Sequence, residues 1–432
     1  MSSLSDSPEL STPADSDEPT PPLVPLLKRI LGATDPAFRA TLDDRALATE
    51  DALRHTLFPV TRAYAYLNHA GVGPPPAPVA WAARDALDAL SCRGSLEMDG
   101  RLPEDEARQR FARLINVAPE TIAFTKNVSD SFVTVAQGLD WRPGDNVVTI
   151  ACEFPANVYP WLNLSEQGVE TRFAPVVDGR VTLEDIAALI DERTRLVSVS
   201  FVEFGTGMRN DVGAIARLAH AAGALCAVDA IQGLGALRLD VTAAEIDFLG
   251  AGSAKWLLSP SHIGLLYVRP SALPLLRVAR LGWRSVTTPF DFFTYDQALR
   301  EDAGRLEGGS NSWIAQVMLD AALRLLEAAG AESIEARALA LAQTLRVNLR
   351  QRGYTVTSPD APTERSQIVT IRWGVERDDA AASTVVARLA SEARVVISAR
   401  SGQLRISPHF YTTEDDIERL LCHLDMMRQK VM

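Results

Sequence analysis

The chain has 432 residues, of which 47% are apolar and 23% charged, and its formal net charge is −12. This length is enough for two or three packed units, and the composition is typical of a globular protein. The negative balance argues against a general nucleic-acid binder, which needs clustered Lys and Arg, and no uncharged apolar run reaches the roughly 18 residues of a membrane span.

The first part of the chain divides in two. Residues 1–22 alternate Ser, Asp, Glu and Pro, which cannot bury enough apolar surface to fold, so we expect a disordered acidic tail rather than a secretory signal. Residues 23–65 have the pattern of a helical segment. The four cysteines of the whole chain lie far apart without a CxxC pair, which favours a cytoplasmic location and gives no signal for a metal site. They are Cys92, Cys152, Cys226 and Cys422.

From residue 121 onward, short β-branched runs alternate with helical periods. One helix begins at Thr182, where Thr182 and Asp185 form a capping-box pattern, and continues through Ile190; another spans 212–222. This alternation predicts an α/β fold with a mostly parallel, seven-stranded sheet covered by helices. The predicted strands are 121–125, 146–151, 170–174, 195–201, 224–228, 247–251 and 264–268.

The pattern changes in the last third of the chain. Residues 277–299 have no clear period and read as a linker, residues 312–329 form a long amphipathic helix, and a helix around 414–427 closes the chain. We therefore expect a large domain over 66–300 and a smaller α+β domain over 301–432.

Polar residues follow two neighbouring predicted strands. Asp229 ends an apolar strand, Gln232 comes three residues later, and Lys255 follows the next strand. Ligands of open α/β sheets bind at the carboxyl ends of strands. A carboxylate there keeps a pyridine nitrogen protonated, and a lysine held out of water readily forms a Schiff base. Each residue alone is a weak motif, because a strand-end Asp is often a helix cap and a Lys before Trp is often solvated.

Several motifs in order resemble the class V aminotransferases of pyridoxal-5′-phosphate (PLP) fold type I. That group includes cysteine desulfurases, selenocysteine lyases, isopenicillin N epimerase-like enzymes and kynureninases. The resemblance runs from about Tyr66 to near the C-terminus and is strongest at 229–232, 255–257 with 264–268, 305–311 and 404–411. It implies a Schiff base on Lys255, Asp229 at the pyridinium nitrogen and Gln232 at the phenolic oxygen.

The same resemblance implies further cofactor contacts. Phe154 falls where a ring stacks on the cofactor, although many relatives have His there, and its alternative is an ordinary core aromatic. Val128 and Ser129 match a phosphate-binding helix start, where a simple N-cap is the alternative. Many relatives have His before the lysine, where this chain has Ala254, and Ser253 is the candidate replacement. Ser310 matches a position that reaches the partner subunit's phosphate, which implies a homodimer with shared active sites.

The substrate side is implied in the same way. Arg405 matches the arginine that binds an α-carboxylate. Asn68 and His69 lie in a loop that approaches the substrate, and a structural His69 is the alternative to a proton-transfer one. Further residues expected near the pocket are Glu203 and Thr206, with Trp283 either bordering the partner's site or packing in a core.

A missing cysteine bears on which reaction the enzyme catalyses. Residues 398–405 read SARSGQLR and lack the loop cysteine of the desulfurases, which disfavours a persulfide-forming enzyme. We therefore expect a PLP enzyme acting at the α-carbon of an amino acid, of the C–S lyase, epimerase or decarboxylative-deaminase type. A true aminotransferase is the main alternative, and a non-catalytic PLP-binding protein is a third.

Overall fold

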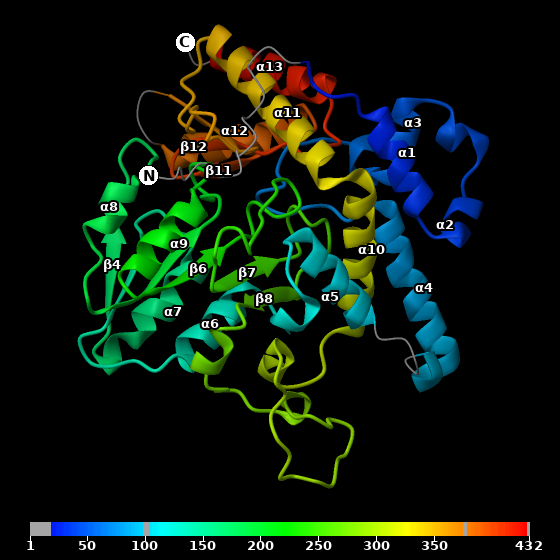
Figure 1. The fold of residues 1–432 in the computed structure, drawn as a ribbon. Helices are drawn as coiled ribbons and strands as arrows, with labels where there is room; N and C mark the ends of the chain where they lie inside the picture. The colour runs from blue at the N-terminus through cyan, green and yellow to red at the C-terminus, as the bar shows by residue number, and fades with distance from the viewer. Residues whose placement is uncertain (1–18, 98–102, 375–377, 430–432) are drawn as a thin grey trace, which may run out of the picture.

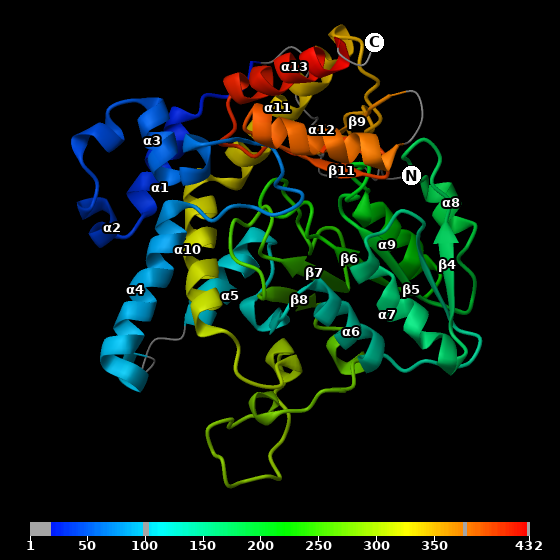
Figure 2. The same cartoon turned by 180° about the vertical axis from the view of Figure 1, so that it is seen from behind.

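The structure is a computed structural model that describes residues 19–97, 103–374 and 378–429. Most of the predicted tail, residues 1–18, lies outside this range. The chain then forms three helices, α1 (Val24–Ala33), α2 (Pro36–Ala40) and α3 (Glu50–Leu57). Next come the short strand β1 (Ala65–Tyr66), α4 (Ala77–Arg93) and α5 (Pro103–Leu114). Figure 2 shows α1 to α4 at one side of the molecule.

The centre is a seven-stranded sheet with the order β2-β8-β7-β6-β5-β3-β4. Strand β8 runs antiparallel to both neighbours and every other pair is parallel, so the predicted mostly parallel sheet is confirmed. Its strands are β2 (Ile122–Thr125), β3 (Asn146–Ile150), β4 (Glu170–Ala174), β5 (Thr194–Ser200), β6 (Leu225–Asp229), β7 (Phe248–Gly252) and β8 (Gly264–Val268).

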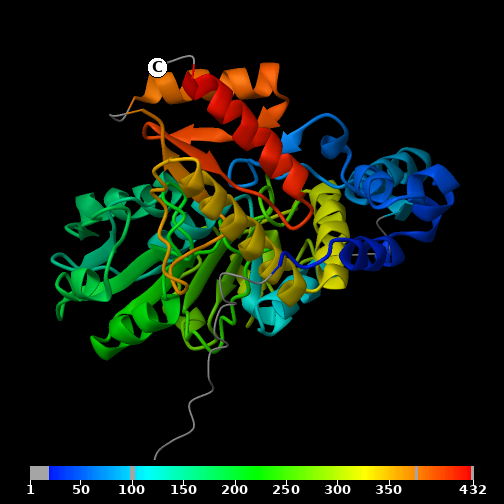
Figure 3. The same ribbon diagram turned by 90° about the horizontal axis from the view of Figure 1, so that it is seen from above.

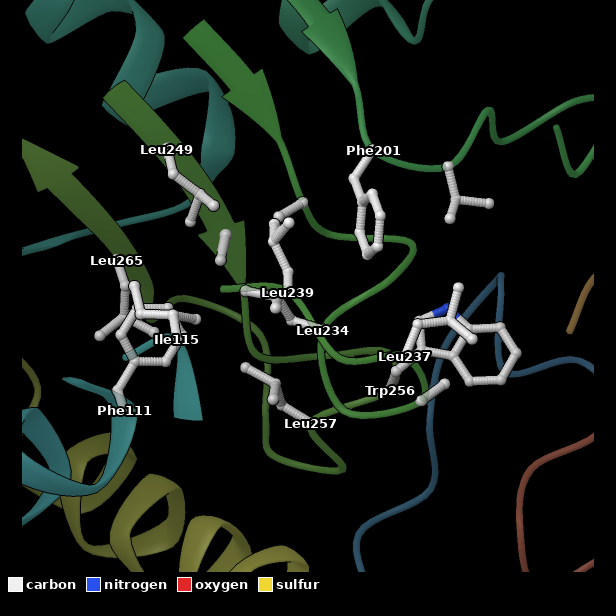
Figure 4. Close-up of a cluster of buried hydrophobic side chains, with 14 of the residues drawn as sticks. Phe111, Ile115, Phe201, Leu234, Leu237, Leu239, Leu249, Trp256, Leu257 and Leu265 are labelled. Atoms are coloured by element: carbon white, nitrogen blue, oxygen red, sulfur yellow. The ribbon is translucent and has the colours of Figure 1, made fainter. Parts of the chain in front are cut away.

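Helices cover both faces of this sheet because successive strand residues point to opposite sides. Val147 and Leu196 face a core shared with α6 (Val128–Gly138) and α7 (Tyr159–Leu162). Val148 and Val197 face a second core with α8 (Leu183–Ala187) and α9 (Val212–Ala221). Figure 4 shows part of this second core, which reaches from Phe111 on α5 to Trp256.

One predicted helix is shorter than expected. Thr182 and Asp185 form the predicted capping box at the start of α8, but the helix ends at Ala187 instead of continuing through Ile190. The apolar period runs on because Leu189 and Ile190 still pack against the core from the turn that leads into β5.

The rest of the chain forms α10 (Trp313–Ala329), α11 (Ala331–Gln351), β9 (Val369–Arg372), α12 (Asp379–Glu392), β10 (Val395–Val396), β11 (Ser398–Arg400), β12 (Gln403–Ile406) and α13 (Glu414–Gln429). Strands β11, β12 and β9 pair antiparallel, and β10 pairs with β1 in a separate two-stranded sheet (Figure 3). Buried side chains of these strands and of α11, α12 and α13 form a further apolar core. Helix α10 packs instead against α1, α4 and α5 in the core of the large sheet. The division at residue 300 stays a prediction, and this packing favours a boundary after α10.

Residues 277–299, the predicted linker, contain a short 3-10 turn at Trp283–Ser285 and an isolated antiparallel bridge between Val286 and Leu299, and they project as a loop below the sheet in Figure 1. None of the helices in the described ranges has the length and apolar character that a membrane span requires.

Candidate active site

The carboxyl edge of the parallel strands brings together most of the predicted site residues. Asp229 ends β6, Lys255 follows β7, Phe154 follows β3, and the loop after β5 carries Phe204. The parallel direction of β3, β5, β6 and β7 places their ends at one edge, so residues far apart in sequence share one site.

Asp229 has one carboxylate oxygen without a partner. It is buried, its Oδ1 accepts the N–H of Ile231 at 3.0 Å, and Oδ2 has no hydrogen-bond partner among the described residues. Burial raises the pKa of Asp229 to about 6, opposed by the Ile231 N–H and the charge of Lys255. A buried, unpaired carboxylate oxygen is suited to a cationic N–H donor, which restores the charged form.

Lys255 is half-buried, whereas Lys28 and Lys126 are exposed. Burial lowers the pKa of Lys255 to about 8; the charge of Asp229 raises it, and those of Arg405 and Arg400 lower it further. Its Nζ lies 5.5 Å from the centre of the Phe154 ring. An amine with this pKa is partly unprotonated at neutral pH and is therefore a nucleophile.

The N-terminal loop holds the backbone of Lys255 in place. The N–H of Gly73 donates to the Ala254 carbonyl at 2.7 Å. A Cβ on Gly73 would lie 1.9 Å from the carbonyl oxygen of Lys255, so this close approach requires glycine.

Gln232 connects the same elements. Its Oε1 accepts the indole N–H of Trp256 at 3.0 Å, and its Nε2 donates to the Ala70 carbonyl at 3.1 Å. A carboxamide has two N–H bonds, so one remains for the predicted contact with a phenolic oxygen. Trp256 was not among the predicted site residues, because an indole beside a lysine has no distinctive signal.

The residues predicted to hold phosphate differ in whether their polar groups are available. Helix α6 begins at Val128, its N-cap Asn127 accepts the N–H of Asp130 at 2.9 Å, and Ser129 is exposed, so the first turn is open to an anion. The Ser253 hydroxyl instead contacts the Pro260 carbonyl and donates to that of Ile263 at 3.0 Å, so a phosphate has to compete with them. Ser310 is exposed on the loop before α10.

Arg405 is a buried cation without an anionic partner. It is 1% exposed on β12; Nη1 donates to the Phe204 carbonyl at 2.7 Å and Nε to the Ser398 hydroxyl at 3.1 Å. Its Nη2 has no partner, and within the described part of the chain no carboxylate pairs with it. Burial lowers the pKa of Arg405 to about 9. A buried guanidinium with a free N–H edge is suited to a carboxylate ligand.

His69 is fully buried and both ring nitrogens are used. The Ser407 carbonyl only accepts, so Nδ1 donates to it at 3.1 Å and Nε2 accepts the Tyr411 hydroxyl at 2.6 Å. Burial keeps the pKa of His69 well below its ordinary value. These contacts support the structural alternative. Asn68 differs, because its buried Oδ1 has no partner among the described residues.

Glu203, in the loop after β5, is a second buried carboxyl group. Glu203 accepts the side-chain amide of Asn210 at 2.8 Å and the thiol of Cys152 at 3.4 Å, and burial raises its pKa to about 7. The neighbouring Glu153 accepts the Ser200 hydroxyl at 2.7 Å. Glu203 therefore supports the loop after β5, and Glu153, which sequence reasoning missed, ties the loop after β3 to β5.

Comparison with known proteins gives consistent matches. A family model described as aminotransferase class-V matches residues 94–420. An uncharacterized aminotransferase, YcbU, of Bacillus subtilis is 27% identical and covers 84% of this chain and 95% of its own length. A probable cysteine desulfurase of Methanothermobacter thermautotrophicus is 32% identical over a match that covers 70% of this chain and 76% of that protein. Among solved structures, a lysine-to-alanine mutant of C-DES with glycine covalently linked to its PLP cofactor has a TM-score of 0.79 at 25% identity, covering 86% of this chain and 98% of that one. C-DES is described as a cystine C–S lyase in a second structure, which has a TM-score of 0.77.

Proposed function

Because this chain belongs to the class V aminotransferase family and is a PLP-dependent enzyme, we propose that it acts at the α-carbon of an amino-acid substrate. The unpaired Nη2 of buried Arg405 carries this proposal, since a substrate α-carboxylate supplies the missing anion. The two phenyl rings between Lys255 and Arg405 support this proposal. The Lys255 Nζ lies 5.5 Å from the centre of the Phe154 ring, the Phe154 and Phe204 ring centroids are 5.2 Å apart, and the Phe204 carbonyl accepts from Arg405.

The residues at the strand edge fit PLP. The unpartnered Oδ2 of Asp229 is suited to accept from the ring nitrogen, and the remaining N–H of Gln232 is suited to donate to the phenolic oxygen. Phe154 is suited to stack on a face of the ring, and the first turn of α6 at Ser129 is suited to bind the phosphate. When bound, PLP supplies a carbonyl carbon that condenses with amines and a ring that accepts an electron pair from the substrate.

The protein's own part is to bind, orient and move protons. Asp229 would hold a proton at the ring nitrogen. Lys255, with its lowered pKa, would hold the cofactor through Nζ and would take the proton from the α-carbon. Arg405 would orient the substrate by its carboxylate, and the burial of Asp229 and Arg405 keeps bulk water from their charged groups.

The reaction branch that we favour is a C–S lyase, epimerase or decarboxylative deaminase rather than a persulfide-forming desulfurase. The strand that carries Arg405 and the one before it have no cysteine. Cys152 lies beside the site, but burial and the carboxylates of Glu203 and Glu153 raise the pKa of its thiol far above the ordinary value, which makes it a poor nucleophile. The cystine C–S lyase named among the similar structures supports the lyase branch.

A true aminotransferase is the second candidate. A relative that covers 84% of this chain is named an aminotransferase, and the same Lys255 returns a proton in either reaction. The two candidates differ in whether a keto acid is needed as a second substrate.

We also propose a homodimer in which Ser310 and the aromatic loop 283–299 face the partner. Trp283 is 40% exposed and packs edge-on against Phe290 and Phe292, at 5.6 and 6.1 Å between centroids. This cluster is outside the core, which argues against core packing for Trp283 and supports a contact with a second copy. The cytoplasmic location stays a prediction, for which the four free cysteines are supporting observations.

Absorbance and product analysis test the proposal. The protein reconstituted with PLP is expected to be yellow, Lys255→Ala to lose the absorbance band, and the exposed-lysine control Lys28→Ala to keep it. The wild type is then incubated with single amino acids, with and without a keto acid, and the products are identified by mass spectrometry. A colourless wild type overturns the cofactor site. Products that form only with a keto acid assign the aminotransferase branch instead.

A further inference from the structure

An aromatic pair borders the space between Lys255 and Arg405. The rings of Phe154 and Phe204 meet edge to face, with centroids 5.2 Å apart and planes at 80°. Phe154 lies beside the Lys255 amine, and the carbonyl of Phe204 accepts from Arg405. Phe154 is 41% exposed and Phe204 half-buried, so the pair presents an apolar surface next to both polar groups.

The turn that carries Phe204 is held from both ends. The N–H of Glu203 donates to the Met208 carbonyl at 2.8 Å, and the N–H of Gly207 donates to the Glu203 carbonyl at 2.9 Å. The buried Glu203 side chain accepts from Asn210. The position of Phe204 is therefore set by the fold before any substrate binds.

We propose that Phe204 selects the substrate by its side chain and admits amino acids whose side chain is apolar. This inference rests on the proposed function, because Arg405 has to hold the α-carboxylate. With the carboxylate on Arg405 and the amino group toward Lys255, the α-carbon stands between them and the substrate side chain meets the nearest wall. A stacked cofactor covers a face of Phe154, which leaves Phe204 as that wall.

The physical preference follows from the surface of the wall. An apolar side chain against Phe204 removes apolar area of both partners from water. A charged or hydrogen-bonding side chain in the same place loses hydration and finds a ring that offers no hydrogen bond.

Arg400 is the competing recognition element. It lies two residues from Ser398 on β11, so both side chains point to the same face, and Ser398 contacts the Arg405 guanidinium. An acidic substrate side chain that reached Arg400 would give the opposite specificity. Arg400 is exposed, and exposed ion pairs contribute little, so we assign the choice to Phe204.

Titrations of the PLP-loaded protein test this assignment. Leucine, methionine, serine and aspartate are each added while the cofactor absorbance is recorded, and kcat/KM is measured for those that react. We expect the apparent Kd of leucine to be about tenfold lower than that of serine in the wild type. Phe204→Ala is expected to remove most of this difference with the serine value changed less than about twofold, and Phe204→Leu, which restores an apolar wall, to regain it.

Phe173→Ala is the matched control. Phe173 is 40% exposed on the edge strand β4, away from the site, so its removal is expected to leave the amino-acid ranking unchanged. Aspartate bound more tightly than leucine, or a leucine preference that persists in Phe204→Ala, overturns the assignment. A cofactor band that responds to no amino acid refutes the proposed function as well. A response that needs Arg405 but ranks leucine and serine alike refutes only the role of Phe204.

Discussion

Replacing Arg405 by methionine is expected to stabilise the cofactor-free protein and to disable substrate binding. Burial lowers the pKa of Arg405 to about 9, well below the ordinary value for arginine. At about 1.4 kcal/mol per pH unit, this difference corresponds to roughly 5 kcal/mol against folding. The unfolded chain holds this proton more tightly than the folded one, so the cost is fully present at pH 7 and is relieved only as the pH rises through about 9.

The net change in stability is smaller than this cost. Arg405→Met removes the buried charge and keeps an apolar side chain of similar length, but it also removes the hydrogen bonds to Phe204 and Ser398, which are worth roughly 1–1.5 kcal/mol each. We expect a gain of roughly 2–3 kcal/mol in the free energy of unfolding. Loss of the charged pair with the substrate carboxylate is expected to raise the apparent Kd of the amino acid at least about thirtyfold.

Urea unfolding of the cofactor-free protein measures the first effect, and amino-acid titration of the PLP-loaded protein measures the second. Arg346→Met is the control, because Arg346 on α11 is also fully buried, has two nitrogens without a partner among the residues that the structure describes, and has a pKa lowered to about 10. It is expected to change stability in the same direction and binding not at all. A destabilised Arg405→Met protein that binds amino acids within about twofold of the wild type would show that Arg405 is a structural residue.

Three further predictions concern the groups around the site. The rate of PLP loading, followed by absorbance, is expected to rise as the pH passes about 8 and then level off, because Lys255 reacts as the free amine; an inflection near pH 10, roughly the ordinary lysine value, would contradict its burial. Gly73→Ala places a Cβ 1.9 Å from the Lys255 carbonyl oxygen and is expected to cost roughly 2 kcal/mol in urea unfolding, whereas Gly32→Ala on α1, with no atom within 4 Å, is expected to be neutral or stabilising; equal effects would argue against a close approach of the loop. The pKa of Glu203 is raised to about 7, so its contribution to stability is present at low pH and is lost as the pH rises toward 7; Glu203→Gln is expected to flatten the change in urea midpoint between pH 5 and pH 8, and an unchanged slope would mean that another group causes it.

The strand and helix pattern could be predicted from the sequence because it is local. Strands buried on both faces read as continuous apolar runs, and all seven predicted runs are strands of the sheet, with ends within a residue or two. The capping box at Thr182 and Asp185 is local in the same way. The end of α8 was not predicted, since Ile190 packs against the core from a turn and so continues the apolar period beyond the helix.

The chain order of motifs also predicted that Asp229, Gln232 and Lys255 lie together, because residues that follow successive parallel strands meet at one edge of the sheet. The sequence by itself therefore determined that these three residues lie at the carboxyl edge of the sheet.

Only the tertiary structure decided which of the remaining polar groups are available to a ligand. His69 is occupied by Ser407 and Tyr411, and Ser253 by its own loop, whereas Arg405 retains a free N–H edge. The proposed role of Phe204 likewise rests on contacts in the tertiary structure. Whether a buried donor has a partner depends on contacts between segments far apart in the chain, and such contacts leave no period or spacing in the sequence.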